Sequence, residues 1–220
     1  MRWTIASRAA THVRARAYVR AMRRIAVIGC GGSGKTTLSR RLGELLELPV
    51  IHIDAHYWRE VDGMRVESTP QQWRECHREL VAGDRWVIDG MKLGVLEQRL
   101  AAADTAILLD LPTVACLWGI LLRRLRFRGQ LRPELGVYDR ITWPFISWVC
   151  SFRRHQRRRI LELLAACDAN VIVLRGWRDA RALVGQIERR AGHDYGFAVD
   201  TLPSSIVYAP RPNGTGRSSA

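Results

Sequence analysis

Gly29-Cys30-Gly31-Gly32-Ser33-Gly34-Lys35-Thr36 is the stretch that decides the fold of this 220-residue chain. It matches the spacing G-x-x-x-x-G-K-[ST], follows an apolar run at 24–28 and precedes a helical pattern. Glycines let successive backbone N–H groups converge on an anion, and the first turn of the following helix adds its dipole. The stretch therefore predicts a phosphate-binding loop (P-loop) between a buried strand and a helix.

The loop also predicts which residues hold a nucleotide and its metal. Lysine carries a compact charge on a flexible stem, so we expect Lys35 to reach the β- and γ-phosphates and to be catalytic. We expect the hydroxyl of Thr36 to ligate Mg²⁺. The predicted ATP-binding residues are Gly29, Gly31, Gly32, Ser33, Gly34, Lys35, Thr36 and Thr37.

Outward from the loop, β-rich runs alternate with helical patterns. The further strands are expected at 49–53, 86–88, 105–109 and 170–174, and the helices at 35–46, 70–82, 113–126, 145–166 and 179–191. Strands that are apolar on both faces belong to parallel sheets covered by helices. We predict an α/β fold of the P-loop nucleoside-triphosphate-binding type, with a five-stranded parallel sheet and the ligand at its carboxyl edge.

The two ends of the chain differ from its middle. Residues 1–24 carry seven Arg and no acid. We expect 1–22 to be a basic extension that is disordered or not native, with a transit peptide as the alternative. Residues 193–220 are rich in Pro, Gly, Ser and Thr and are expected to be a disordered tail. One domain is therefore predicted at 23–192.

Hydropathy and cysteine usage limit where the protein works. No apolar run approaches the ~20 residues that a membrane-spanning helix needs, so no membrane partner is expected. Five scattered cysteines without CxxC spacing fit free thiols in a reducing cytoplasm. We therefore predict a cytoplasmic protein.

The net charge of +14 is concentrated in two segments. Besides the N-terminal one, residues 123–159 carry eleven Arg against two acids. Arginine groups on both sides of a Gly- and Pro-bearing linker fit a lid, near 124–152, that closes over a polyphosphate. A solvated face and a nucleic-acid-binding patch are the alternatives. The predicted catalytic arginines are Arg123, Arg126, Arg128, Arg153 and Arg157.

Three aspartates follow apolar runs. Asp89 is interpreted as a metal-orienting acid for Mg²⁺, or as a turn residue. Asp110, before Leu111 and Pro112, is interpreted as a simple exit turn. Asp54 is predicted to orient or deprotonate the hydroxyl of an acceptor, with helix capping as the alternative.

The segment near 54–84 is predicted to bind that acceptor. Tyr57 and Trp58 are core residues or walls of its pocket. His52 and His56 are interpreted as packing or pocket residues rather than metal ligands. Arg99 is a candidate for acceptor phosphate, with a surface-helix position as the alternative.

Together these motifs resemble the adenylate-kinase-related P-loop kinases, and within them the small bacterial proteins labelled DNA topology modulation proteins. The resemblance covers about 23–178. It rests on the glycine loop and on four further stretches, Ile53-Asp54-Ala55-His56-Tyr57-Trp58, Val87-Ile88-Asp89-Gly90, the run 103–112 and Arg123-Arg124-Leu125-Arg126-Phe127-Arg128-Gly129.

The resemblance implies an adenylate-kinase-like phosphotransferase with an Arg-rich lid, using ATP and Mg²⁺. It implies that Asp89 is the Mg²⁺-associated acid and that Arg123, Arg153, Arg154 and Arg157 contact phosphates. Adenylate kinases continue with Phe-Pro-Arg where this chain has Met91-Lys92-Leu93. Lys92 is therefore the predicted acceptor-binding cation, and the acceptor stays open between a nucleotide, a nucleoside and another small molecule.

Two other functions were weighed against the kinase. A nucleic-acid-associated ATPase would use the basic lid and the N-terminal arm to bind phosphate backbones. A switch-type NTPase would need a guanine-specificity motif such as Asn-Lys-x-Asp, which the sequence lacks. Within the predicted domain the charge excess is confined to 123–159, which favours the phosphotransferase, with the ATPase as its alternative.

Overall fold

The computed structural model describes residues 22–61, 64–127, 131–132, 137–138, 141–191 and 207–209. The helices and strands, in chain order, are β1 (Arg24–Gly29), α2 (Lys35–Leu46), β2 (Val50–His52), α3 (Ile53–His56), β3 (Trp58–Val61), β4 (Met64–Glu67), α4 (Pro70–Val81), β5 (Trp86–Asp89), the 3-10 turn η1 (Leu93–Val95), α5 (Leu96–Ala102), β6 (Thr105–Leu109), α6 (Thr113–Phe127), β7 (Leu131–Arg132), β8 (Val137–Tyr138), α7 (Trp143–His155), α8 (Arg157–Ala166), β9 (Asn170–Leu174), α9 (Trp177–Ala191) and β10 (Val207–Ala209).

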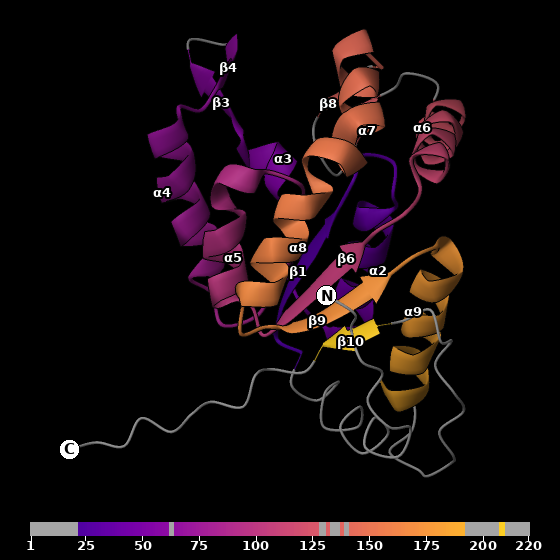
Figure 1. The fold of residues 1–220 in the computed structure, drawn as a ribbon. Helices are drawn as coiled ribbons and strands as arrows, with labels where there is room; N and C mark the ends of the chain where they lie inside the picture. The colour runs from indigo at the N-terminus through magenta and orange to yellow at the C-terminus, as the bar shows by residue number, and fades with distance from the viewer. Residues whose placement is uncertain are drawn as a thin grey trace, which may run out of the picture.

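A central sheet has the strand order β10-β9-β6-β1-β5-β2 (Figure 1). Strands β9, β6, β1, β5 and β2 are parallel, which confirms the predicted five-stranded sheet. Strand β10 adds an antiparallel edge and comes from the predicted disordered tail, whose other residues lie outside the described part of the chain. The strands β1 and β5 at the centre are buried along nearly all of their length, as a two-sided sheet requires.

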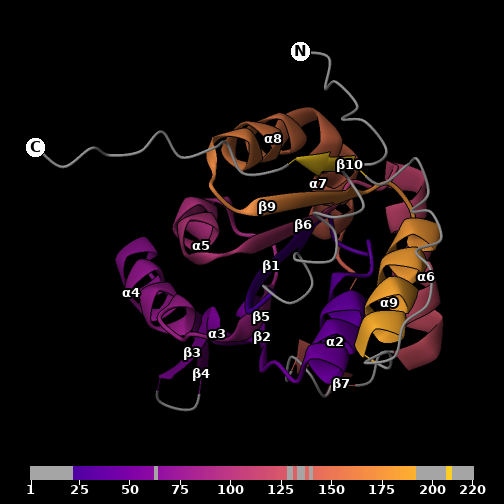
Figure 2. The same cartoon turned by 90° about the horizontal axis from the view of Figure 1, so that it is seen from below.

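Helices cover both faces of this sheet (Figure 2). Helices α2 and α9 pack on each other and on one face, while α4, α5 and α8 cover the other. Helices α6 and α7 pack together beyond the carboxyl ends of the strands, where the loop between β1 and α2 also lies (Figure 1). The carboxyl edge is thus bordered by α3, α6 and α7.

The predicted helix starts are confirmed where a cap or a loop defines them. Helix α2 spans Lys35–Leu46, as predicted from the glycine loop. Helix α4 begins after Thr69, whose side chain accepts the N–H of Gln72 while the Gln72 amide accepts the N–H of Thr69. This reciprocal capping box, with Pro70 in the first turn, satisfies backbone donors that would otherwise lack partners.

The helix predicted at 145–166 is interrupted, which corrects that prediction. The structure ends α7 at His155 and begins α8 at Arg157, with Gln156 between them. Arg153 and Arg157 lie on either side of this break, and both bind one carboxylate of the sheet edge.

The predicted boundaries of the extension and the lid also shift. Met22, the last residue of the predicted extension, is buried in the core, and residues 1–21 lie outside the described part. Helix α7 occupies much of the predicted lid at 124–152, yet its Val149 and Phe152 are core residues. The two-residue strands β7 and β8 pair with each other inside that segment.

Among the residues that the structure describes, no helix is both long enough and apolar enough to cross a bilayer.

Candidate active site

The glycine loop joins β1 to α2 and is pressed against α6. Gly32 has φ +77°, a left-handed conformation that glycine tolerates best. A Cβ on Gly32 would lie 2.1 Å from the carbonyl oxygen of Cys116 on α6, so any side chain would clash there. On the other side, Trp177 at the start of α9 donates its indole N–H to the carbonyl of Ser33, at 3.1 Å. Two helices distant in sequence therefore fix the shape of the loop.

Lys35 points back into the loop. Its ammonium donates to the carbonyl oxygen of Cys30 at 2.7 Å. Burial of the ammonium group lowers the pKa of Lys35, while the carboxylates of Asp54 and Asp89 oppose that shift. The carboxylates of Asp54 and Asp89 therefore act on the ammonium group of Lys35.

Asp89 ends β5 directly beside β1, opposite Val27 in the register. Its side chain is buried, and Oδ1 lies 2.8 Å from Nδ1 of His52 at the end of β2. Because an ionised carboxylate only accepts hydrogen bonds, Nδ1 of His52 is the donor. The other oxygen, Oδ2, is buried without a hydrogen-bond partner in the described structure.

The unpartnered Oδ2 of Asp89 tests whether this residue fits the predicted Mg²⁺ site. Buried polar atoms in folded proteins nearly always have partners, and a carboxylate oxygen is a ligand that Mg²⁺ prefers. The described residues contain no group of three or more His, Cys, Asp or Glu side chains that would form a protein cage for a metal. A metal held by one or two protein oxygens together with phosphates is the usual magnesium arrangement, and Asp89 with Thr36 fits it.

Asp54 lies two residues beyond the end of β2, in the short helix α3. The sequence reading placed it directly after a strand; the structure places it in the first turn of that helix, with its side chain exposed. Its carboxylate still raises the pKa values of Lys35 and Arg99, against the opposing effect of burial. Asp54 is therefore a solvent-facing carboxylate at the carboxyl edge of the sheet.

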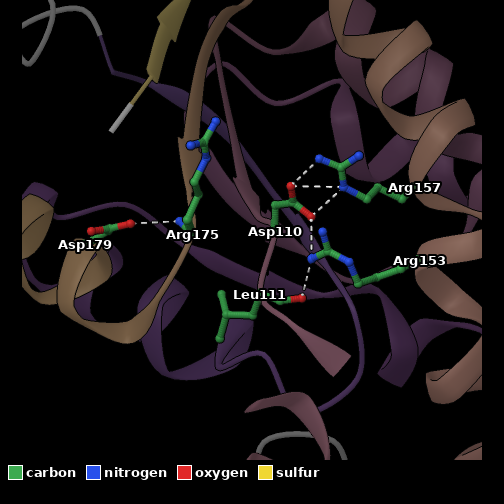
Figure 3. A network of polar contacts seen from close by, with 6 residues as sticks. All are labelled: Asp110, Leu111, Arg153, Arg157, Arg175 and Asp179. Atoms are coloured by element: carbon green, nitrogen blue, oxygen red, sulfur yellow. Dashed lines mark hydrogen bonds and ion pairs between the residues drawn. The ribbon is translucent and has the colours of Figure 1, made fainter. Parts of the chain in front are cut away.

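Arg153 and Arg157 are held by Asp110 (Figure 3). Arg157 forms a bidentate pair, with Nε at 2.8 Å from Oδ1 and Nη2 at 2.7 Å from Oδ2. Arg153 donates to Oδ1 of Asp110 at 3.2 Å and to the carbonyl of Leu111 at 3.0 Å. Asp110, which was interpreted as a simple exit turn, thus ties α7 and α8 to the end of β6. Sequence reasoning missed this role.

The other predicted lid arginines lie apart from this network. Arg123 is half-buried on α6 with its guanidinium 6.0 Å from the ring centre of Phe145 on α7. Arg126 is exposed on α6, and Arg128 lies outside the described residues. Phe145 also packs over Gly31, where a Cβ would come within 2.8 Å of its ring. The α6–α7 pair therefore covers the glycine loop.

A cavity of about 380 Å³ opens between α3, β4, α4 and the segment after β5. Its lining residues are Tyr57, Glu67, Ser68, Pro70, Trp73, Lys92, Leu93 and Gly94. The ammonium of Lys92 lies 3.5 Å from the ring centre of Tyr57, whose hydroxyl donates to Glu67 at 3.1 Å. Two predicted acceptor residues, Tyr57 and Lys92, thus meet in one cavity with aromatic walls.

The remaining predicted acceptor residues are placed differently. Trp58 begins β3, and its side chain is outside the described part. Arg99 is fully buried on α5 and does not line the cavity; its Nη1 donates to the carbonyl of Gly90 at 3.1 Å. Burial lowers the pKa of Arg99 to about 10, against the opposing effect of Asp89 and Asp54. Arg99 is neither a surface-helix residue nor a wall of the cavity.

Two thiols also meet under the loop. Cys30 and Cys116 are both buried and share a hydrogen bond, which raises the pKa of Cys30 and lowers that of Cys116. Nothing in the sequence pairs Cys30 with a residue of α6. The pair adds to the contacts by which α6 supports the loop.

Comparisons with known proteins bear on the fold. Neither a protein-family model nor a curated protein matches the sequence. A shikimate kinase from Acinetobacter baumannii, solved with shikimate, superposes with a TM-score of 0.50 at 17% identity, covering 80% of this chain and 96% of that one. The chain has the fold of the P-loop kinases.

Two further solved structures are similar at lower scores. A shikimate kinase from Bacteroides thetaiotaomicron has a TM-score of 0.45 at 20% identity, with 79% of this chain and 100% of that chain covered. A gluconokinase from Sinorhizobium meliloti has a TM-score of 0.43 at 16% identity, with 77% and 89% covered. The comparisons as a whole lend no support to the resemblance to DNA topology modulation proteins.

Proposed function

We propose that this chain is an ATP-dependent phosphotransferase that moves the γ-phosphoryl group of ATP to a hydroxyl of a small acceptor. The observation that carries the proposal is the glycine loop between β1 and α2, with Lys35 in the first turn of α2 and Asp89 at the end of the neighbouring strand β5. The cavity lies between the segments that follow Asp54 and Asp89, which supports an acceptor site beside the proposed nucleotide site.

The glycine loop is proposed to bind the triphosphate. Its backbone N–H groups and the N-terminus of α2 face the same anion, and the ammonium of Lys35 exchanges the Cys30 carbonyl for phosphate oxygens. Thr36 and Thr37, in the first turn of α2, are the remaining residues proposed to bind the triphosphate. Catalysis of phosphoryl transfer depends mainly on alignment and neutralisation of charge, which a rigid loop provides.

Thr36 and Asp89 are the residues that would hold Mg²⁺. When bound, the ion would offset the negative charge of the phosphates. The contribution of the chain itself is orientation: His52 fixes one oxygen of Asp89 and leaves the other directed away from that hydrogen bond. Supporting hydrogen bonds of this kind hold ligands in place and tune their affinity.

Asp54 is proposed to orient the acceptor hydroxyl and to take its proton as the new O–P bond forms and the bond to the β-phosphate oxygen breaks. Its exposure at the sheet edge gives the hydroxyl access to it. Lys92 is proposed to bind an anionic group of the acceptor, with Tyr57 and Trp73 as apolar walls. The acceptor class is therefore a small hydroxyl compound that bears a negative charge, such as a nucleotide or another small anion.

Arg123 is proposed to contact the transferring phosphate, since it lies on α6 next to the loop. Arg153 and Arg157 would contact phosphate only after they leave Asp110, which holds both of them in this structure. Catalytic roles for Arg126 and Arg128 stay predictions from the sequence, as does binding of acceptor phosphate by Arg99.

The direct test is an acceptor screen with ATP and Mg²⁺, following ADP release. The panel holds nucleoside monophosphates, nucleosides, hydroxylated carboxylates and sugar acids. We expect one charged class to stimulate release at least tenfold over basal hydrolysis. Release that no acceptor stimulates, but that duplex or single-stranded DNA does, would favour the nucleic-acid-associated ATPase instead.

A further inference from the structure

Cys30 and Cys116 form a pair of thiols from segments that are far apart in the sequence. Cys30 is the second residue of the glycine loop, and Cys116 lies in the first turn of α6. Both residues are buried, at 3% and 0% exposed, and their thiols share a hydrogen bond. The fold therefore brings two reduced sulfur atoms together at the proposed nucleotide site.

The backbones of the loop and of α6 are in direct contact beside this pair. A Cβ on Gly32 of the loop would lie 2.1 Å from the carbonyl oxygen of Cys116. A Cβ on Gly119, one turn further along α6, would lie 2.1 Å from the carbonyl oxygen of Gly32. Since neither contact has room for a side chain, the helix and the loop lie against each other with the two thiols between them.

The surroundings of the pair make Cys116 the more reactive thiol. The hydrogen bond with Cys30 lowers the pKa of Cys116, burial opposes this shift, and the charges of Lys35 and Arg153 add to it. The same hydrogen bond raises the pKa of Cys30. Because the thiolate is the nucleophilic form of cysteine, Cys116 reacts first and Cys30 is the thiol that follows.

We propose that Cys30 and Cys116 are an oxidative modification site, at which a peroxide forms a disulfide that switches off the glycine loop. The thiolate of Cys116 attacks one peroxide oxygen, the O–O bond breaks, and a sulfenic acid and hydroxide form. The sulfur of Cys30 then attacks the sulfur of Cys116, the S–O bond breaks, and water leaves with the thiol proton of Cys30. Two thiols are oxidised, and hydrogen peroxide is reduced to two molecules of water. The switching role rests on the proposed function, in which this loop binds ATP.

The disulfide would change the shape of the loop. It would place the two sulfur atoms about 2.05 Å apart, closer than two hydrogen-bonded thiols. The contacts at Gly32 keep α6 from moving closer as a rigid body, so the loop has to adjust around Cys30. The carbonyl of Cys30 also accepts the ammonium of Lys35, so an adjustment there moves the partner of the predicted phosphate-binding lysine. Oxidation should therefore weaken ATP binding, and reduction should restore it.

The test oxidises the full chain with hydrogen peroxide, blocks the remaining thiols with N-ethylmaleimide and digests the protein with trypsin. Cys30 and Cys116 lie in different tryptic peptides, 25–35 and 100–123, each with a single cysteine. We expect these peptides to be joined, at the sum of their masses less two hydrogen atoms. Calorimetry with ATP should show at least tenfold weaker binding after oxidation and full recovery with dithiothreitol, a comparison that needs no substitution.

Two serine variants separate this pair from general oxidation. Cys116→Ser should bind ATP as the reduced unmodified chain does and keep that affinity after peroxide. Cys150→Ser, which removes an exposed thiol on α7, is the matched control and should still form the joined peptides and lose affinity.

Three results would count against the proposal. Failure to form the joined peptides in a chain that binds ATP normally would overturn this inference alone. An unchanged ATP affinity in the joined form, or an equal loss in Cys116→Ser, would overturn the switching role. A reduced chain that does not bind ATP would contradict the proposed function and the switching role together.

Discussion

His52 Nδ1 lies 2.8 Å from Asp89 Oδ1, joining the ends of two neighbouring parallel strands at the carboxyl edge of the sheet. The hydrogen bond leaves Oδ2 of Asp89 as a buried oxygen without a partner in the described structure. It thereby makes His52 the positioning residue for the proposed Mg²⁺ site.

Replacing His52 should weaken magnesium binding more than nucleotide binding. His52→Ala releases Asp89, and loss of such supporting hydrogen bonds costs about 10- to 100-fold in metal affinity. We expect the Mg²⁺ concentration for half-maximal turnover to rise about tenfold, while ATP binding without Mg²⁺ changes little. Titration of turnover with Mg²⁺ measures the magnesium requirement, and calorimetry with ATP alone measures nucleotide binding. An unchanged magnesium requirement would remove His52 from the site.

Replacing Asp110 should loosen α7 and α8. Asp110→Asn removes the charge that accepts three hydrogen bonds from Arg157 and one from Arg153, and charged hydrogen bonds contribute about 1.5–3 kcal/mol. Since both arginines are partly exposed, we expect a loss of about 1–3 kcal/mol in urea unfolding. Glu162→Gln, which breaks an exposed pair with Arg158, is the control and should cost under about 0.5 kcal/mol. Equal losses in both variants would contradict a structural role of Asp110.

The buried His77 should make the fold sensitive to mild acid. Burial, and then the charge of Arg99, lower the pKa of His77 from 6.5 to about 4. Between those values the unfolded chain binds a proton that the folded chain does not, so stability falls as the pH drops from about 6.5 to about 4. The contribution is of order 3 kcal/mol over that window.

His77→Phe keeps the ring that packs 5.8 Å from Trp73 and removes the titrating group. The slope of unfolding free energy against pH between 6.5 and 4 should then become shallower than in the unmodified chain. The absolute stability of the variant does not enter this comparison, because only the slopes are compared. Parallel slopes would show that His77 does not carry the pH dependence.

Replacing Lys92 should impair the acceptor and spare the nucleotide. Lys92→Met keeps much of the apolar contact with Tyr57 and removes the ammonium that faces the cavity. We expect the KM for the acceptor to rise about tenfold, with the KM for ATP unchanged. Lys92→Arg should restore part of the affinity because it restores the charge. A variant whose two KM values both match those of the unmodified chain would place the acceptor elsewhere.

The sequence predicted those parts of the site that depend on local pattern. The glycine loop, the start of α2 at Lys35 and the Thr69 cap each follow from a short motif with a defined backbone geometry. Buried strand runs predicted the parallel sheet. Within that sheet Asp89 ends β5 beside β1, the strand that leads into the glycine loop.

Contacts between distant segments could not be predicted in this way. Asp110 meets Arg157 only because the helix breaks at Gln156, where the sequence has neither Pro nor Gly to signal a break. His52 meets Asp89 because β2 lies next to β5, a strand order that hydropathy does not determine. Arg99 reads as an amphipathic-helix residue, yet its guanidinium is buried under Gly90.

The central claim, phosphoryl transfer from ATP at the glycine loop, is tested most directly by Lys35→Ala. Turnover is measured as ADP release with saturating acceptor and Mg²⁺, beside Lys92→Met as a variant that leaves the loop intact. We predict that Lys35→Ala lowers kcat at least a hundredfold, while the fold keeps its melting temperature within a few degrees. A Lys35→Ala protein with the unmodified rate and ATP affinity would contradict the assignment of the loop and with it the proposed function.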